Sequence, residues 1–417
     1  MRRHTLPRLC ALVGLGGAWA QPALPRDTDT VALGPGYGLQ VYYSLQRGVV
    51  STVSLDRWHL AFEVAPRGAA IRTNHAAGVI VYKTRRDTTG WASLALEDTT
   101  ERLYDDLCRW TQGAFNRTAN PNNPADFGWG LYNSSTRIVT GDSLYILRVG
   151  QTYYKVWIRE LRDNTYYLRT AALDGSGELN TTVPKSLGAS AKFVYYNLST
   201  GQALALEPPA AEWDLLFTQY VAFVTPPGGG PAVPYPVVGA FQNPAVRVAR
   251  VRLTRQANPD TLTPAAYTLD SCLSTIGHDW KEWDGTQWRL ADTLYFLVKD
   301  GTGALWRVRF IGFEGRSTGR ILVEKARLSG SAGLEATQAS GLYRLYPQPA
   351  QTELNLYAPF PLHTVELYGL TGQLAYRWEA LAGTEVRLAR PPFLPAGLYL
   401  LRLIGPAQEE WMKVIFE

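Results

Sequence analysis

The feature that most constrains this chain is a pair of aromatic segments that occurs twice, one domain length apart. The first copy has VYYSL at 41–45 and WHLAF at 58–62, and the second has VYYNL at 194–198 and WDLLF at 213–217. The offsets are 153 and 155 residues, which is too long for a solenoid repeat and is the usual length of a whole domain. The sequence therefore predicts two similar domains in tandem.

A second repeated pattern indicates that these domains are built from antiparallel strands. Residues 153–159 alternate between two faces after a turn at 150–152, and residues 305–310 alternate in the same way after the turn at 300–301. Matching positions of the two hairpins differ by a constant 152 residues. The chain is also rich in Tyr (23) and Trp (13), which fit the pleated surface of a sheet. We therefore expect a mainly β protein.

One stretch of the first copy breaks the β pattern. Residues 98–101 (DTTE) have the spacing of a capping box, and Leu103, Leu107 and Trp110 recur at helical intervals before Gly113. This spacing predicts a helix of about three turns that packs on the sheet.

The first 20 residues have the layout of a secretory signal peptide. Three arginines precede an apolar run at 9–18, and Ala-Trp-Ala follows at 18–20. Removing these three arginines from the formal charge of +5 leaves +2, without a basic face that would suit nucleic acid. No other apolar stretch approaches the ~18 residues of a membrane span.

The signal peptide would remove Cys10 and leave Cys108 and Cys272. An oxidising compartment would allow these two to pair. They lie in different copies at positions that are not equivalent, however, so the sequence favours two separate buried thiols.

Five segments of the two copies together resemble a known family: 41–45, 58–62, 71–74 (IRTN), 213–217 and 274–281 (STIGHDWK). They resemble the HmuY-like haem-binding family of the Bacteroidota, whose members are β-rich surface proteins that take haem from carriers. The resemblance covers about 290 residues. The first copy departs from it with His59 where the family has Asp, and the second has residues 221–223 in place of Arg-Thr-Asn.

The resemblance implies that haem or another tetrapyrrole could be bound, and the sequence makes no cofactor certain. Haem takes axial ligands from His, Met, Cys or Tyr, and the only methionines are Met1 and Met412. His59 and His75 are the candidate ligands, because their imidazoles could approach each other if the two strands pair as a hairpin. Ordinary surface or turn histidines are the alternative, and no axial-ligand motif of the family is matched here.

Seven residues near the end of the chain form a motif: Tyr346, Pro347, Pro349, Gly372, Gly397, Tyr399 and Lys413. With this motif, the last part of the chain resembles the C-terminal sorting domain of type IX secretion cargo. In the family this is a small antiparallel β-sandwich, read by the secretion machinery and usually cleaved by a sorting peptidase. The resemblance implies the Sec translocon and the type IX machinery as partners, and a secreted or outer-membrane surface location.

We find no pattern that predicts an enzyme. The chain has no H-E-x-x-H, C-x-x-C, G-x-S-x-G or Walker motif. Asp279, Glu282 and Asp284 lie among three tryptophans, at 280, 283 and 288, and this cluster could suit a sugar or a metal. A Trp-rich β core with charged turns is the explanation that the sequence favours. The function expected is that of an exported, non-enzymatic protein that binds haem, or alternatively of an adhesive surface protein with glycan contacts.

The expected organisation, in chain order, is a signal peptide at 1–20, an N-terminal arm at 21–38, a first HmuY-like β-domain at 39–175, a linker at 176–190, a second HmuY-like β-domain at 191–328, a linker at 329–340 and the sorting domain at 341–417.

Overall fold

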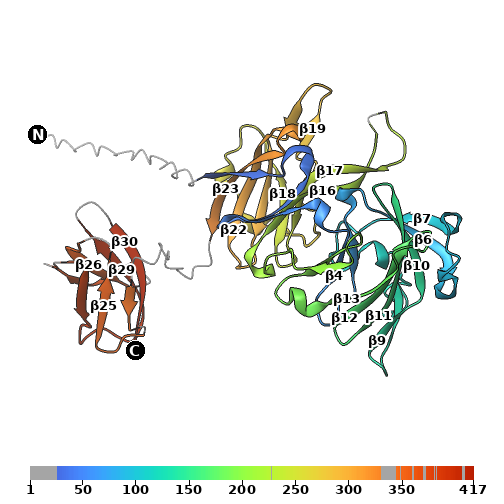
Figure 1. The fold of residues 1–417 in the computed structure, drawn as a ribbon. Helices are drawn as coiled ribbons and strands as arrows, with labels where there is room; N and C mark the ends of the chain where they lie inside the picture. The colour runs from blue at the N-terminus through green and yellow to red at the C-terminus, as the bar shows by residue number, and fades with distance from the viewer. Residues whose placement is uncertain are drawn as a thin grey trace, which may run out of the picture. The chain divides into compact units, whose positions relative to one another are not determined.

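The structure is a computed structural model that describes residues 26–226, 228–329, 344–347, 349–358, 361–369, 372–379, 381, 383–405 and 409–417. The expected signal peptide and most of the second linker lie outside these residues. The chain divides into two compact units, the first made of residues up to Val298 with Trp306–Arg327, and the second of Lys299–Leu305 with Leu328–Glu417. The expected mainly β fold is confirmed, since the only helical segments of the described residues are 3-10 turns (Figure 1).

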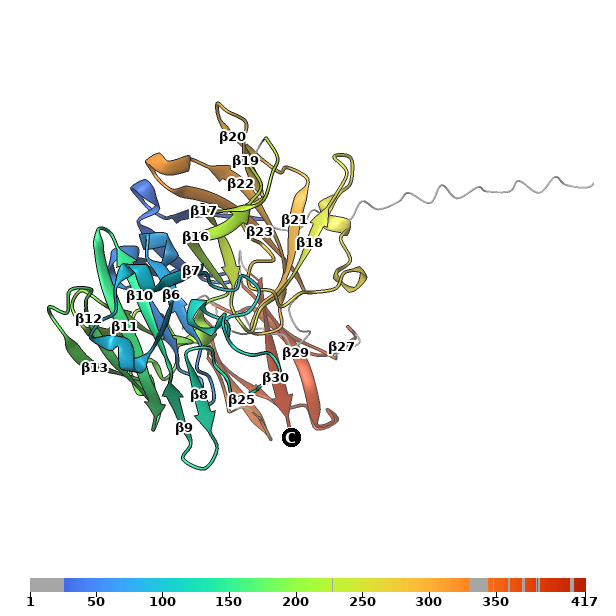
Figure 2. The same cartoon turned by 90° about the vertical axis from the view of Figure 1, so that its right-hand side faces the viewer.

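The first unit contains two β bodies, each built from two antiparallel sheets that enclose a core (Figures 1 and 2). We call them the first body and the second body. The first body has a four-stranded sheet in the order β15-β14-β4-β5 and a larger sheet in the order β13-β12-β11-β10-β6-β7, to which β8 and β9 are attached. The strands of the first body are β4 (Leu60–Glu63), β5 (Ile71–Thr73), β6 (Ile80–Asp87), β7 (Thr99–Leu103), β8 (Gly130–Asn133), β9 (Ile138–Gly141), β10 (Ser143–Val149), β11 (Thr152–Arg162), β12 (Thr165–Ala172), β13 (Leu179–Pro184), β14 (Phe193–Asn197) and β15 (Gln202–Leu204).

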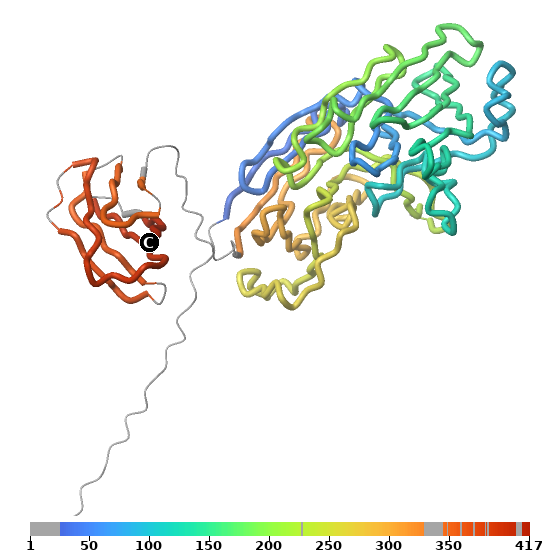
Figure 3. Tube along the Cα trace, turned by 90° about the horizontal axis from the view of Figure 1, so that it is seen from below, coloured from blue at the N-terminus to red at the C-terminus, as the bar shows by residue number. Residues whose placement is uncertain are grey.

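The second body has sheets in the orders β17-β16-β2-β3 and β1-β23-β22-β21-β18, with a short hairpin of β19 and β20. Its strands come from both ends of the unit, as the blue and orange segments in Figure 3 show. They are β1 (Asp27–Ala32), β2 (Leu39–Ser44), β3 (Gly48–Ser54), β16 (Leu215–Val224), β17 (Val233–Gln242), β18 (Arg247–Arg252), β19 (Lys281–Trp283), β20 (Trp288–Leu290), β21 (Leu294–Lys299), β22 (Leu305–Phe313) and β23 (Arg320–Ser329).

Short 3-10 turns connect many of these strands. They are η1 (Pro35–Tyr37), η2 (Leu55–Arg57), η3 (His75–Ala77), η4 (Thr88–Trp91), η5 (Leu96–Asp98), η6 (Ala114–Asn116), η7 (Lys185–Gly188), η8 (Ala210–Glu212), η9 (Pro259–Thr261), η10 (Pro264–Ala266) and η11 (Gly315–Ser317).

The cores follow the two-residue alternation of the sequence. Val156 and Ile158 of β11 are fully buried and pack with Phe62 and Tyr166 in the core between the two sheets of the first body. Arg159, which follows Ile158, is exposed because successive side chains of a strand point to opposite faces. The hairpin expected around residues 150–152 is therefore present as β10 and β11.

The opening strands of each copy pair with the other copy. β2, which carries the first VYY motif, pairs with β16, and β14, which carries the second motif, pairs with β4. Tyr43 lies opposite Leu215 and Tyr196 lies opposite Leu60, so the two ladders have the same register at equivalent positions. β1 likewise pairs with β23, and β13 with β12. The two copies thus complete each other's sheets.

This exchange crosses the domain limits expected from the sequence. Residues 39–54, assigned to the first domain, lie in the sheets of the second body. Part of the expected N-terminal arm is the edge strand β1, and part of the expected linker 176–190 is the strand β13. The first body is therefore a continuous stretch of chain from β4 to β15, inserted between β3 and β16 of the second body.

The expected helix after residue 98 is wrong. Its first part is the strand β7, and the chain from 104 to 113 follows an irregular path held by carboxylates. Asp105 accepts hydrogen bonds from the backbone N–H groups of Thr73 and Ala114. Gly113 therefore does not end a helix. It is needed for space, because a Cβ there would lie 1.9 Å from the carbonyl oxygen of Ile71. Its small size lets the loop lie against β5.

The described residues of the second unit form seven strands in two antiparallel sheets with the orders β24-β25-β28 and β27-β26-β29-β30. Leu354, Leu367, Leu388 and Leu401 are fully buried in one core to which both sheets contribute, as expected for a small β-sandwich. The strands are β24 (Arg344–Tyr346), β25 (Glu353–Tyr357), β26 (Thr364–Tyr368), β27 (Leu374–Trp378), β28 (Glu385–Ala389), β29 (Gly397–Ile404) and β30 (Glu409–Phe416).

Candidate functional site

The two bodies of the first unit meet at the repeated aromatic residues. The hydroxyls of Tyr42 and Tyr195, which are equivalent in the two copies, lie 2.8 Å apart. Tyr42 packs edge-on against Trp213 at 5.2 Å, and Tyr195 packs against Trp58 at 4.8 Å. An axis of internal two-fold symmetry therefore passes between the two tyrosines.

His59 has a structural partner at this junction. Its Nδ1 accepts a hydrogen bond of 2.9 Å from the backbone N–H of Leu198. At the equivalent place Asp214 Oδ2 accepts the N–H of Leu45 at 2.8 Å. The two side chains thus bind equivalent backbone groups, although one is an imidazole and the other a carboxylate. Burial lowers the pKa of His59, which keeps its ring neutral and able to accept.

The structure also corrects the matching of the two copies. Asn74 donates its backbone N–H to the carbonyl of His59, and Asn243 donates in the same way to Asp214. The counterpart of the segment 71–74 is therefore 240–243, and not 221–223 as the sequence suggested. The misassignment arose because β16 and β17 extend far beyond β4 and β5 before the chain returns.

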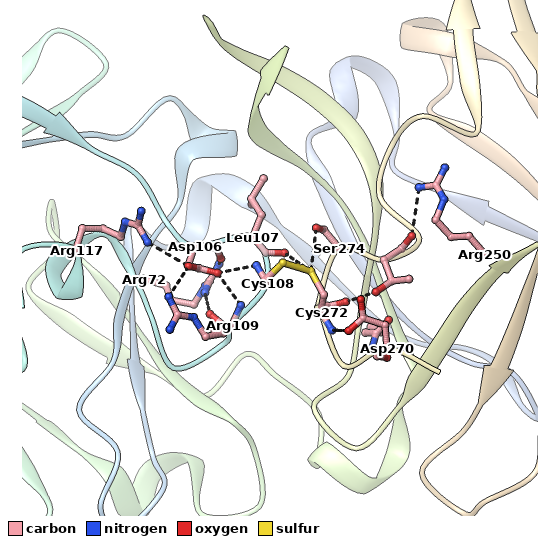
Figure 4. Close-up of a disulfide and its surroundings, with 12 residues drawn as sticks. Arg72, Asp106, Leu107, Cys108, Arg109, Arg117, Arg250, Asp270, Cys272 and Ser274 are labelled. Atoms are coloured by element: carbon pink, nitrogen blue, oxygen red, sulfur yellow. Dashed lines mark hydrogen bonds and ion pairs between the residues drawn. A yellow bond between two sulfur atoms is a disulfide. The ribbon is translucent and has the colours of Figure 1, made fainter. Parts of the chain in front are cut away.

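The expected pair of separate thiols is also wrong, because Cys108 and Cys272 form a disulfide (Figure 4). The loops that carry them run together, with Leu273 N–H bonded to the carbonyl of Cys108 and Ser274 N–H bonded to that of Leu107. The cysteines occupy different positions in the repeat, but the exchange of strands brings their loops to the same side of the junction. The disulfide links the first body to the second.

A surface groove of ≈ 790 Å³ lies beside this disulfide and is lined by residues of both copies. Tyr104, from the first copy, packs edge-on against Phe223 of β16 at 5.2 Å, and Phe223 is 56% exposed. Tyr220 and His278 also line the groove, with the Tyr220 hydroxyl 3.3 Å from His278 Nδ1. Its size falls within the ~300–1,000 Å³ of small-molecule sites.

The charges of the groove are largely paired within it. Arg250 forms two hydrogen bonds of 2.8 Å with the Asp279 carboxylate, and Arg117 pairs with Asp106 at 3.1 Å. Burial opposes the ionisation of Asp279, but the hydrogen bond and charge of Arg250 outweigh it and lower the pKa of Asp279. The groove is therefore polar and aromatic without a strong charge of either sign.

A smaller cavity of ≈ 70 Å³ lies next to the groove, at the junction itself. The cavity and the groove share Asp105, Leu107 and Tyr220 as lining residues. Trp58 and Thr73, both at least nine-tenths buried, line the cavity. Trp58 Nε1 and Thr73 Oγ1 are buried atoms without a hydrogen-bond partner among the described residues.

The two candidate haem ligands do not line a common cavity. His59 is 5% exposed and lines neither the cavity nor the groove. His75 lines the cavity, where its Nδ1 lies 3.0 Å from the carbonyl oxygen of Val79. A cavity of ≈ 70 Å³ is far below the ~300 Å³ that the smaller cofactor sites reach. This arrangement does not fit a haem held between His59 and His75.

The tryptophan cluster of the second copy has a structural explanation for its charges. Asp284 accepts backbone N–H groups of its own turn and pairs with Arg289, while Asp279 pairs with Arg250. Trp283 is 51% exposed and packs on Trp288 in the β19–β20 hairpin. Within the part of the chain that the structure describes, no group of three His, Cys, Asp or Glu could hold a metal ion.

The motif residues of the second unit lie at strand ends and turns as well as within strands. Tyr346 ends β24 and is followed by Pro347 and Pro349. Gly372 follows β26 with a φ of 81°, which favours glycine, and Gly397 begins β29. Tyr399 of β29 and Lys413 of β30 lie on adjacent strands, and the Tyr399 ring packs on Phe416.

No protein-family model and no curated protein matches this chain. Among the described residues, no helix is long and apolar enough to cross a membrane. Ser274, Gly277, His278 and Asp279 of the lining belong to the segment 274–281, but the aromatic residues Tyr104 and Phe223 belong to no binding motif of the sequence. Tyr104 comes from the stretch that was expected to be a helix, and Phe223 comes from the strand β16 of the other copy. Their contact therefore depends on the strand exchange.

Proposed function

We propose that this is an exported, non-enzymatic binding protein that holds its ligand in the groove between the two bodies. The observation that carries the proposal is the groove of ≈ 790 Å³, which is lined by both copies and has the exposed ring of Phe223, packed edge-on against Tyr104, on its wall. Exposed aromatic rings beside paired polar groups are typical of binding surfaces.

Export by type IX secretion is the second part of the proposal. It is supported by the sorting-domain resemblance of the second unit and by the disulfide between Cys108 and Cys272, a bond that persists mainly in oxidising compartments outside the cytoplasm. In a bacterium with type IX secretion, we expect the full chain to reach the surface or medium. Removal of residues 341–417 should leave it in the periplasm, and unchanged export of the shortened chain would contradict this part.

A tetrapyrrole is the second candidate ligand, because His278 places an imidazole on the groove wall. In this proposal His278 would supply the axial nitrogen, and the haem would contribute the iron that binds it. Haemin titrated into the secreted chain should then give a sharpened, shifted Soret band that His278→Ala removes and His59→Ala/His75→Ala retains. An unchanged spectrum at micromolar protein rules the tetrapyrrole out.

The groove itself is tested by a pair of matched variants. Phe223→Ser removes the exposed ring from the groove, and Tyr235→Ser removes a ring of similar exposure, 58%, from the neighbouring strand but outside the groove lining. Binding to glycan or cell-surface arrays should fall for Phe223→Ser and persist for Tyr235→Ser. Equal retention of both variants would show that the ligand binds elsewhere.

A further inference from the structure

The cavity beneath the groove offers hydrogen-bonding groups that are not used inside the protein. Three residues that line it have a buried polar atom without a partner among the described residues: Trp58 Nε1, Thr73 Oγ1 and His75 Nε2. A buried polar group that lacks a partner is unfavourable, because it has lost its hydrogen bonds to water. Three such atoms among the residues that line one cavity make it a candidate site for a polar group.

The chemistry of these atoms defines what can bind. His75 Nδ1 lies against a carbonyl oxygen, so it must carry the proton and donate it, which leaves Nε2 as a hydrogen-bond acceptor. The indole N–H of Trp58 can only donate, and the hydroxyl of Thr73 can do both. An occupant therefore has to donate to His75 and accept from Trp58.

Neither a cation nor an anion meets these needs. Arg72, the cation of the lining, lies over the ring of Trp110 and donates to the carbonyls of Arg109 and Asp106. Asp105, the carboxylate of the lining, is bonded to backbone N–H groups. A carboxylate would face the lone pair of His75, and an ammonium would face the N–H of Trp58. A hydroxyl group and a water molecule both donate and accept, and neither carries a charge.

We propose that this cavity is the inner subsite of the groove and takes a neutral hydroxyl group of the ligand, which assigns the ligand to the saccharides. The inference rests on the proposed function. A cavity of ≈ 70 Å³ accommodates a few heavy atoms, such as a hydroxymethyl arm, but no whole sugar ring. The ring then lies in the groove, where Tyr104 and Phe223 supply apolar faces.

Two isosteric variants test the inner subsite in the full secreted chain. Thr73→Val removes the unpaired hydroxyl, and Thr218→Val is the control, because Thr218 also lines the cavity but its hydroxyl is already bonded to the carbonyl of Gln219. Binding of methyl glucoside, methyl galactoside and N-acetylglucosamine is measured by calorimetry, with acetate and methylammonium as charged probes. We expect at least one sugar to bind, about tenfold more weakly to Thr73→Val than to Thr218→Val, and neither ion to bind.

The outcomes separate the subsite from the groove. If Phe223→Ser weakens sugar binding but Thr73→Val does not, the inner subsite is wrong and the groove stands. If no sugar binds the unaltered chain, the saccharide assignment is wrong, whereas array binding that Phe223→Ser leaves unchanged refutes the groove itself. A second readout is the thermal stability of the ligand-free protein. Thr73→Val should leave it unchanged or higher, because the variant removes an unpaired buried hydroxyl, and a large loss of stability would contradict an unfilled hydrogen bond.

Discussion

The two copies of the repeat use different side chains for one task. In each body a residue after the motif tryptophan accepts the backbone N–H of a leucine from the other copy, and this residue is His59 in the first body and Asp214 in the second. The backbone pairing around them is the same, since Asn74 donates its N–H to the carbonyl of His59 and Asn243 donates its N–H to the carbonyl of Asp214. The difference therefore teaches that the backbone exchange is the constant feature of the repeat, and that the acceptor chemistry can vary.

The largest effect is expected for the covalent link between the copies. The Cys108→Ser/Cys272→Ser variant opens a loop of 164 residues, and the chain-entropy model assigns such a link about 5 kcal/mol of stability. Urea unfolding of the variant, compared with the unaltered protein under oxidising conditions, measures this loss. A loss below about 1 kcal/mol would show that the exchanged strands alone hold the bodies together.

The next largest effect on stability is expected for Glu207, a carboxyl that lies beside Tyr195 and has no counterpart beside Tyr42. Glu207 accepts from the Tyr195 hydroxyl, whereas Tyr42 on the other side is bonded to Gln40. Burial raises the pKa of Glu207 to about 7. The folded protein therefore binds the Glu207 proton more tightly than the unfolded chain does. The stability that this proton contributes is complete below pH ~4.5, and about 3 kcal/mol of it is lost as the pH rises towards 7.

The variant Glu207→Gln isolates this contribution. The difference in unfolding free energy between the unaltered protein and the variant should fall by this amount from pH 4.5 to 7.5. A difference that does not change with pH would mean that Glu207 is ionised in the folded state.

Loss of either acceptor should cost about 1–3 kcal/mol, because His59→Ala and Asp214→Ala each leave a buried N–H unpaired. The two losses should be similar if the bodies are equivalent. Denaturant midpoints of the two single variants measure this directly. If only one of the two variants lost stability, the two acceptors would not contribute equally to the stability of the fold.

His59→Asp is the sharper variant, because it gives both bodies the same acceptor. The lowered pKa of His59 means that its contribution is complete above pH ~6.5 and is lost as the pH falls towards the folded pKa. Compared with His59→Asp, the unaltered protein should therefore lose stability on acidification from pH 7 to 5. If the stabilities of the unaltered protein and of His59→Asp changed in parallel with pH, His59 would not be the acceptor of the Leu198 N–H.

The smallest effect on folding is expected at the groove. Phe223 is 56% exposed, so Phe223→Ser should change stability by less than about 1 kcal/mol although it weakens binding. Thermal unfolding measures the first and array binding the second. A strongly destabilised Phe223→Ser would make its loss of binding uninformative.

The sequence predicted the strands of this protein better than their partners. Alternation placed Val156 and Ile158 in a core, because a two-residue period depends only on neighbours along the chain. It could not show that Tyr43 pairs with Leu215 rather than with Leu60, because both partners have the same apolar pattern. The domain limits drawn from the repeats consequently cut through the sheets.

The expectations that failed at the site depended on the same exchange. Leu107 and Trp110 have helical spacing, but they face the junction from an irregular loop whose turns are fixed by Asp105 and Asp106. The disulfide joins positions that no comparison of the repeats would match. The groove and the cavity need residues of both copies, so no single segment predicts them.

The most direct test of the account is a measurement of which copy each motif strand contacts. In the full chain with selectively labelled tyrosine and tryptophan, nuclear Overhauser effects report pairs of protons that lie within about 5 Å. The exchange predicts contacts from the Tyr42 ring to Trp213 and Tyr195, and from the Tyr195 ring to Trp58. Contacts from Tyr42 to Trp58 and from Tyr195 to Trp213 instead would show two separate domains and would contradict the exchange, and with it the groove that the exchange builds.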